Sequence, residues 1–314
     1  MLNVQTLNKD GSFAAVLGQE TAKQGLRSAL LSQRNVLIIG PPGIGKTTLA
    51  KEVALLLPPI EKDGKKQSGA SRFIRVQGSP DLTVEDLIGD IDPIKALKFG
   101  PQSIEAFTPG KIFRADKGVL FFDEINRCPE KVQNALLQVL EEKKATIGSY
   151  KLDFDADFIL IATMNPEDSS TEKLSDVFLD RFDCIYMGYP ESLDIEKAIV
   201  LSKHHHDDIA MPGKLLDLAI GFVRLLRESP KLEKRPSVRA SLGLVERAKA
   251  NALLRGSSAA DFDDLKSVVV SVIAHRIRLK PSHRFTTSLA DFIEKEFSQH
   301  AEDYADEEEK GDGL

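Results

Sequence analysis

Apolar residues in the first 190 positions fall into short, continuous runs that alternate with helix-like patterns. The clearest runs are rich in β-branched residues and occupy positions 35–39, 72–76, 118–122, 158–162 and 184–187. Continuous apolar strands separated by helices are typical of a parallel sheet that is covered on both faces. We therefore predict an α/β domain with a parallel sheet over residues 1–190.

Beyond position 190 the pattern changes to successive amphipathic helices. Apolar residues recur at helical spacing over 214–228, 237–255 and 261–278, with Gly and Pro between them. This pattern predicts an all-helical second domain over residues 191–300. The remaining residues, 301–314, are acidic and nearly free of apolar side chains, so we expect a disordered tail there.

Two segments interrupt the alternation of strands and helices. Residues 87–115 contain several glycines and prolines between short apolar pieces, which favours an inserted hairpin or loop over a core helix. In residues 145–154, two alternating segments flank Gly148-Ser149, and this pattern indicates a second hairpin. We expect both segments to be additions to the sheet.

A glycine-rich loop follows the first apolar run and leads into a helical pattern at 48–57. Glycines let backbone N–H groups and a helix N-terminus face phosphate oxygens, and a lysine there neutralises the β and γ oxygens. The alternative is a chance glycine turn, and the strand and helix on either side argue against it. The predicted phosphate-binding residues are Gly40, Pro41, Pro42, Gly43, Ile44, Gly45, Lys46, Thr47 and Thr48, with Thr47 also a magnesium ligand.

Two carboxylates, Asp123 and Glu124, end the apolar run at 118–122. At the carboxyl end of a strand, Asp123 can hold magnesium while Glu124 polarises the attacking water. Taken alone, two acids after a strand are more often a solvated turn. The glycine-rich loop upstream favours the catalytic interpretation.

Two further polar residues stand at the ends of predicted elements. Asn165 ends another apolar run, where its amide can orient the hydrolytic water. An Asn that starts a turn before Pro166 explains this residue equally well. Ser237 can cap a helix whose first turn then carries Arg239.

The order of these motifs resembles the AAA+ ATPases. The loop at 40–47, the Asp123-Glu124 strand, the sensor Asn165 and Leu179-Asp-Arg181-Phe182 follow one another as in that family. The resemblance covers about residues 13–278. It implies a P-loop parallel sheet with a C-terminal helical lid, and an ATP hydrolase that uses ATP and Mg²⁺.

Within these ATPases the chain resembles the clade with an insert in the second helix, and it combines marks of two of its families. The segments 120–127 and 133–141 are similar to MoxR-type ATPases. By contrast, Gly89-Asp-Ile-Asp92, Ala96-Leu97 and Phe107-Thr-Pro-Gly110 are similar to the insert of the magnesium chelatase ATPase subunit.

The resemblance also implies roles for residues outside the two main motifs. Arg181 matches the arginine finger that reaches the γ-phosphate of a neighbouring subunit; a surface pairing with Asp180 or Asp183 is the alternative. Arg239 is similar to the second sensor of MoxR-type lids. Val16 and Leu17 look like the adenine-side segment, although core packing explains them nearly as well.

A homo-oligomeric ring, expected to be a hexamer, follows from the arginine-finger match of Arg181. The MoxR resemblance implies a protein client with a von Willebrand factor A domain. One alternative is the ATPase subunit of a chelatase-like metal insertion complex. A second is a nucleic-acid motor related to minichromosome maintenance helicases, for which Lys143, Lys144 and Lys151 beside the second hairpin supply a basic cluster. A solvated hairpin explains those lysines equally well.

Composition narrows the classes of partner. The net charge of −6 disfavours broad binding to nucleic acid. No apolar run approaches the ~20 residues that cross a bilayer, and the N-terminus lacks a secretory signal pattern. We expect a cytoplasmic protein with no membrane partner.

Overall fold

The computed structural model describes residues 2–9, 11–62, 64–100, 103–146, 153–166, 174–205, 208–284 and 287–311. The chain divides into two compact units, one of Met1–Pro41 with Gly45–Met187 and one of Pro42–Ile44 with Gly188–Leu314. Each unit contains its own cluster of buried apolar side chains.

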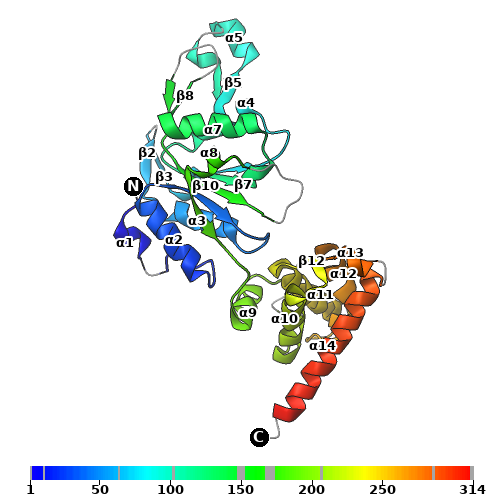
Figure 1. The fold of residues 1–314 in the computed structure, drawn as a ribbon. Coiled ribbons are helices and arrows are strands. Elements are labelled where there is room, and N and C mark those ends of the chain that lie inside the picture. Colours follow the sequence, from blue (N-terminus) through cyan, green and yellow to red (C-terminus); the bar gives the residue numbers. More distant parts are fainter. Residues whose placement is uncertain are drawn as a thin grey trace. The chain divides into compact units, whose positions relative to one another are not determined.

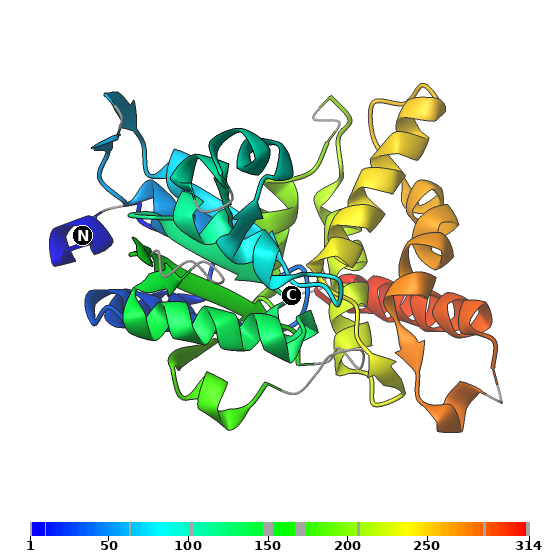
Figure 2. The same cartoon turned by 90° about the horizontal axis from the view of Figure 1, so that it is seen from above.

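A five-stranded parallel sheet forms the centre of the first unit, in the order β11-β1-β10-β7-β4 (Figure 1). Figure 2 shows helices on both sides of these strands, which explains why most of their side chains are apolar. The predicted parallel sheet is confirmed. Its strands are β1 (Asn35–Ile39), β4 (Phe73–Gln77), β7 (Val119–Asp123), β10 (Ile159–Met164) and β11 (Phe182–Tyr186).

Helices of the first unit bury one face against this sheet. Leu26 of α2 and Leu49 and Val53 of α3 are fully buried, as are Leu136 of α7 and Phe178 of α8. The bounds are α1 (Val4–Leu7), α2 (Glu20–Leu31), α3 (Lys46–Leu55), α4 (Val84–Ile88), α6 (Lys111–Arg114), α7 (Glu130–Glu142) and α8 (Asp176–Leu179), with short 3-10 turns η1 (Ala70–Arg72) and η3 (Ile125–Arg127).

Three antiparallel hairpins extend from the sheet. The insert predicted at 87–115 contains β5 (Gly89–Ile91) paired with β6 (Phe107–Pro109), with α5 (Pro93–Phe99) and η2 (Ile104–Ala106) between them (Figure 1). The second predicted hairpin is β8 (Lys144–Thr146) with β9 (Asp153–Asp155); Gly148, Ser149 and Lys151 lie outside the described residues. The pair β2 (Ile60–Lys62) and β3 (Lys65–Gln67) was not predicted.

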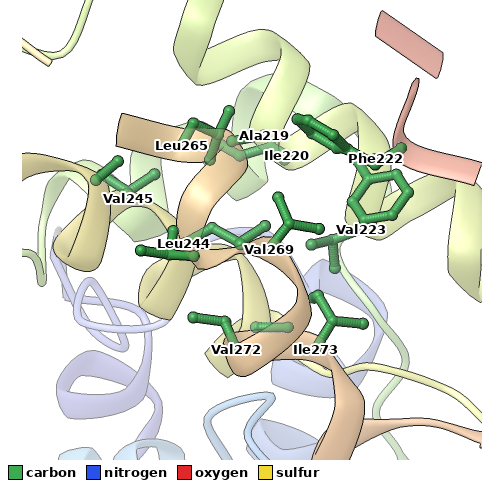
Figure 3. Close-up of a cluster of buried hydrophobic side chains, with 14 of the residues drawn as sticks. Ala219, Ile220, Phe222, Val223, Leu244, Val245, Leu265, Val269, Val272 and Ile273 are labelled. Atoms are coloured by element: carbon green, nitrogen blue, oxygen red, sulfur yellow. The ribbon is translucent and has the colours of Figure 1, made fainter. Parts of the chain in front are cut away.

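The second unit is a bundle of helices, as the sequence predicted. Figure 3 shows its core, where Phe222 and Val223 of α10, Leu244 of α11 and Val269 of α12 pack together. A short ladder of β12 (Leu232–Lys234) with β13 (Arg278–Leu279) adds to the expected helices. The helices are α9 (Leu193–Leu201), α10 (Gly213–Glu228), α11 (Val238–Leu254), α12 (Phe262–Ile273), α13 (Pro281–Arg284) and α14 (Leu289–Gly311), with the 3-10 turn η4 (Ala274–Arg276) after α12.

Helix α14 differs from the expected disordered tail, because it continues through residues 301–311. Phe292, Ile293 and Phe297 are buried in the bundle, and Ala301 and Tyr304 continue the same helical face and pack against the core. Composition alone concealed this face. Among the described helices, none is long and apolar enough to cross a membrane.

A buried ion pair joins three helices of the second unit. Glu196 of α9 is fully buried and accepts two hydrogen bonds from Arg227 of α10, at 2.6 and 2.7 Å. The hydroxyl of Ser241 on α11 donates to the same carboxylate. Because a buried charge is costly unless it is paired, this network fixes how α9, α10 and α11 lie together.

Candidate functional site

The loop between β1 and α3 depends on glycines at two positions. Gly43 has φ of 78° and Gly45 has φ of 99°, a region that side chains with a Cβ rarely adopt. Gly45 is also the N-cap of α3, whose first helical residue is Lys46. The free N–H groups of the first turn of α3 and the loop amides therefore suit an anionic ligand.

The ammonium group of Lys46 lies over this loop. Its Nζ donates hydrogen bonds to the carbonyl oxygens of Gly40 and of Pro41, the latter at 2.8 Å. Thr47 and Thr48 follow in the first turn of α3, and both are half-buried. A cation beside a row of amides is an arrangement that can bind phosphate oxygens.

The register of the sheet brings the other candidate residues to the same edge. Gln77, the last residue of β4, pairs with Asp123 at the end of β7. The end of β10 is fixed beside the loop, since the N–H of Gly40 donates to the carbonyl of Met164 at 3.2 Å. Asn165 comes next in the chain and is half-buried. The loop, the two acids and Asn165 thus share the carboxyl edge of the sheet.

Both carboxylate oxygens of Asp123 are hydrogen-bonded. Oδ1 accepts from the hydroxyl of Thr163 at 2.6 Å, and Oδ2 accepts from Nη2 of Arg75 at 2.6 Å. The Asp123 side chain is only 14% exposed, whereas that of Arg75 is 51% exposed. Asp123 is therefore held by one neutral donor and one cation.

The backbone of Glu124 is strained. It has φ of 54° and ψ of 50°, a left-handed conformation that costs a non-glycine residue roughly 1 kcal/mol or more. Its N–H donates to the Thr163 hydroxyl at 2.9 Å, and its carboxylate accepts from Gln77 Nε2 at 3.0 Å. Arg127 lies 3.2 Å from the same carboxylate. These contacts hold Glu124 in a geometry that the residue does not prefer.

Gly78 allows the chain to pass close to this strained turn. A Cβ at Gly78 would lie 2.0 Å from the carbonyl oxygen of Glu124, closer than atoms can approach. The N–H of Gly78 donates to the Asp123 carbonyl at 2.7 Å. Strand β4 can therefore follow the acid pair closely enough for Gln77 to reach Glu124.

Arg75, Gln77 and Thr163 were missed by sequence reasoning. Their signal was present, because Arg75 and Gln77 are polar residues two apart at the end of an apolar strand, and Thr163 interrupts another apolar strand. Only the pairing of β4 and β10 with β7 shows that all three face the acids.

A magnesium ion would find suitable donors here. The hydroxyl of Thr47 and the carboxylate of Asp123 are hard oxygen ligands of the kind that Mg²⁺ prefers. Among the described residues there is no cluster of three or more His, Cys, Asp or Glu side chains able to hold a metal. An ion at this edge would thus complete its coordination with water and phosphate oxygens, as Mg²⁺ commonly does.

Arg181 lies at the opposite edge of the sheet. It directly precedes β11, and its carbonyl oxygen accepts from Asn35 at the start of β1. Its guanidinium group is bonded to the carboxylate of Glu141 and to the Val177 carbonyl, rather than to Asp180 or Asp183. Arg181 is thus separated from the phosphate loop of its own subunit by the length of a five-residue strand, ~16 Å.

The remaining candidates have simpler settings. Val16 is 5% exposed and Leu17 is 36% exposed, so the first is a core residue in this structure. Arg239 is exposed in the first turn of α11, and its N–H donates to the Ser237 hydroxyl at 3.3 Å. The predicted helix cap is confirmed.

Comparison with known families places the chain. Residues 12–176 match the family model for magnesium chelatase, subunit ChlI, which is more than half of the sequence. The chain belongs to the ChlI family. Residues 226–296 match the AAA lid domain. The first unit is therefore an AAA+ core and the second its helical lid.

ChlI-family and MoxR proteins appear together among its relatives. The chaperone MoxR1 of Mycobacterium tuberculosis is 28% identical, over 84% of this chain and 73% of its own. The magnesium-chelatase 38 kDa subunit of Cereibacter sphaeroides is 24% identical, over 88% and 94%. An uncharacterised Bacillus subtilis protein, YeaC, is 29% identical, over 86% and 85%. The predicted resemblance to both MoxR-type ATPases and the magnesium chelatase ATPase subunit is confirmed.

Solved structures agree on the fold. A complex of the BchI and BchD subunits of magnesium chelatase contains a chain with a TM-score of 0.50 and 22% identity, over 88% of this chain and 98% of that one. A RuvB branch migration motor from Thermotoga maritima reaches 0.52 at 19% identity, over 86% and 74%. At these identities the likeness shows the AAA+ fold alone.

We predict that Thr163→Val destabilises the ChlI-type core by about 1–3 kcal/mol, because the Glu124 N–H and the Asp123 carboxylate each lose a partner in a fully buried place. Urea unfolding measures the change. Thr163→Ser keeps the hydroxyl and serves as the control. Equal stability of the valine and serine variants would contradict the bridging role of Thr163.

Proposed function

We propose that this chain is a Mg²⁺-dependent ATP hydrolase of MoxR type, which assembles into a ring and remodels or activates a protein partner. The observation that carries the ATPase part is the convergence of the glycine loop, Lys46 and the two acids at one edge of the sheet. In this proposal Lys46 and the loop hold ATP, and Thr47 and Asp123 hold magnesium. Glu124 is the base and Asn165 orients the water.

The chemistry follows from what each group can do. Bound magnesium neutralises charge on the β and γ oxygens. The Glu124 carboxylate accepts a proton from the water that attacks the γ-phosphorus, while the bond between that phosphorus and the β–γ bridging oxygen breaks and ADP leaves. The hydrogen bond from Gln77 keeps the Glu124 carboxylate in place. The amides and Lys46 stabilise the charge that develops on the phosphate oxygens. We also propose that Val16 and Leu17 lie on the adenine side of the nucleotide. Arg239 is proposed to act from the lid as the second sensor.

The site supports a ring because Arg181 is far from its own phosphate loop. Arg181 lies at the opposite edge of the sheet, so the γ-phosphate that it can reach is the one bound by a neighbouring subunit. Within the subunit Glu141 holds the guanidinium group, so an assembling ring would exchange that carboxylate for phosphate. Ring closure and hydrolysis are thereby coupled in this proposal.

An exposed apolar surface supports a protein client. We define the insert tip as Ile94, Leu97, Phe99 and Ile104, which are 80%, 90%, 49% and 56% exposed. None of the residues of α5 is buried. Such an exposed apolar cluster is typical of a contact with another polypeptide.

The alternative is an ATPase subunit of a chelatase-like metal insertion complex. It is favoured by the match of residues 12–176 to ChlI and by the likeness of 88% of the chain to a chelatase subunit. Both functions need the same nucleotide chemistry. They differ in the partner that the ring contacts.

Two variants separate binding from hydrolysis. Lys46→Ala is expected to weaken binding of a fluorescent ATP analogue, because backbone amides cannot replace the ammonium charge.

Glu124→Gln is expected to bind ATP normally and to lose turnover by ~10²-fold or more, since the amide is no base. Unchanged affinity in the first, or wild-type phosphate release in the second, would remove the corresponding assignment.

Mixing of inactive variants tests the role of Arg181. Arg181→Ala should bind ATP and lose hydrolysis by ~10²-fold or more, whereas a surface ion pair contributes at most about 1 kcal/mol. In a mixed ring, an Arg181→Ala subunit supplies an intact phosphate loop and a neighbouring Lys46→Ala subunit supplies an intact Arg181. Some interfaces then contain both. Phosphate release should partly return. Continued inactivity despite demonstrated co-assembly would exclude a role in trans.

Capture of the client decides between the two functions. Glu124→Gln is used as bait in native extract, and a bound protein with a von Willebrand factor A domain would support remodelling. Capture of a large porphyrin-binding subunit would support the chelatase alternative. Leu97→Asp should abolish capture, and Leu254→Asp, an 86% exposed leucine of the lid, is the matched control. Equal capture by both variants would exclude the insert tip as the contact.

A further inference from the structure

Arg75 links the two acids of the site. It lies on β4, the outer strand of the sheet, and its Nη2 donates to Asp123 Oδ2 at 2.6 Å and to Gln77 Oε1 at 3.0 Å. Gln77 in turn donates to Glu124 at 3.0 Å. The metal-binding carboxylate and the hydrolytic carboxylate are thus joined through one arginine and one amide.

The partners of Asp123 differ in how they respond to a metal ion. Thr163 is a neutral donor on Oδ1, fully buried, and it also accepts from the Glu124 N–H. Arg75 is a cation on Oδ2, with half of its side chain in solvent. A guanidinium group and Mg²⁺ at one carboxylate repel each other, and the exposed, long side chain is the one that can leave.

We propose that Arg75 is the resident counter-ion of Asp123 and that magnesium must displace it to bind with the nucleotide. This inference rests on the proposed Mg²⁺-nucleotide site. Pairing with Arg75 lowers the apparent affinity for the metal, because only the unpaired fraction of Asp123 can bind it. In exchange, the partly buried Asp123 carboxylate stays neutralised whenever the metal is absent.

The displacement also reaches Glu124. When Arg75 leaves Asp123, the hydrogen bond that it gives to Gln77 is free to rearrange, while the backbone bridge through Thr163 is unaffected. Binding of the metal therefore changes the contacts of the Glu124 carboxylate and leaves those of the Glu124 backbone as they are. Arg75 is in this sense a positioning residue.

The experiment measures metal binding rather than turnover. Mn²⁺ is titrated into the full-length protein with ADP at a fixed concentration, and free Mn²⁺ is followed by electron paramagnetic resonance. Arg75→Gln should lower the Mn²⁺ concentration at half-saturation by about 5-fold, the factor that corresponds to about 1 kcal/mol of ion pairing. The neutral glutamine leaves the Thr163 contact intact.

A matched control separates pairing from general charge. Arg127→Gln removes a cation that is paired with Glu124 at 3.2 Å, and should change half-saturation less than 2-fold. In an Asp123→Asn background, Arg75→Gln should have no further effect. Circular dichroism checks folding, and Arg75→Met replaces the glutamine variant if that one unfolds.

The possible outcomes test the displacement of Arg75 separately from the proposed ATPase function. If wild-type protein binds no ADP with or without metal, the proposed function fails and the inference falls with it. If ADP binds with Mn²⁺, but Arg75→Gln leaves half-saturation unchanged or Arg127→Gln shifts it equally, Arg75 is not the displaced counter-ion. The ATPase proposal would survive that result.

Discussion

The hydroxyl group of Thr163 is the contact on which the rest of the site depends. It donates to Asp123 and accepts from the backbone of Glu124, so one fully buried atom fixes two consecutive acids. Without it, the left-handed turn at Glu124 would lack a partner for its N–H. The contacts of Gln77 and Arg75 then set the direction of the two carboxylates.

The parallel sheet determines what each subunit can do alone. Loops that follow parallel strands gather at one edge, which is why the phosphate loop, Asn165 and the acids come together. Loops that precede the strands gather at the other edge, where Arg181 is held by Glu141. In the proposed ring, the carboxyl ends of the strands therefore contact the subunit's own nucleotide, and Arg181 at the other ends contacts the nucleotide of a neighbour.

Local patterns were enough to predict most of this arrangement. The loop at 40–47, the acid pair and the cap of α11 are encoded by neighbouring residues, so they could be predicted from the sequence. Arg75, Gln77 and Thr163 escaped because their partners are 39 to 48 residues away and depend on the order of the strands. The partner of Arg181 and the helical course of α14 escaped for the same reason, since both depend on packing between distant segments.

The left-handed backbone of Glu124 also affects which substitutions the chain tolerates. At a φ of 54°, a glycine would be unstrained, whereas the glutamate is strained whenever the protein is folded. A glycine at this position would relieve the backbone strain while removing the carboxylate. Selection for stability and selection for the proposed chemistry thus act in opposite directions at this one residue, and a screen for heat-resistant variants would tend to recover inactive ones.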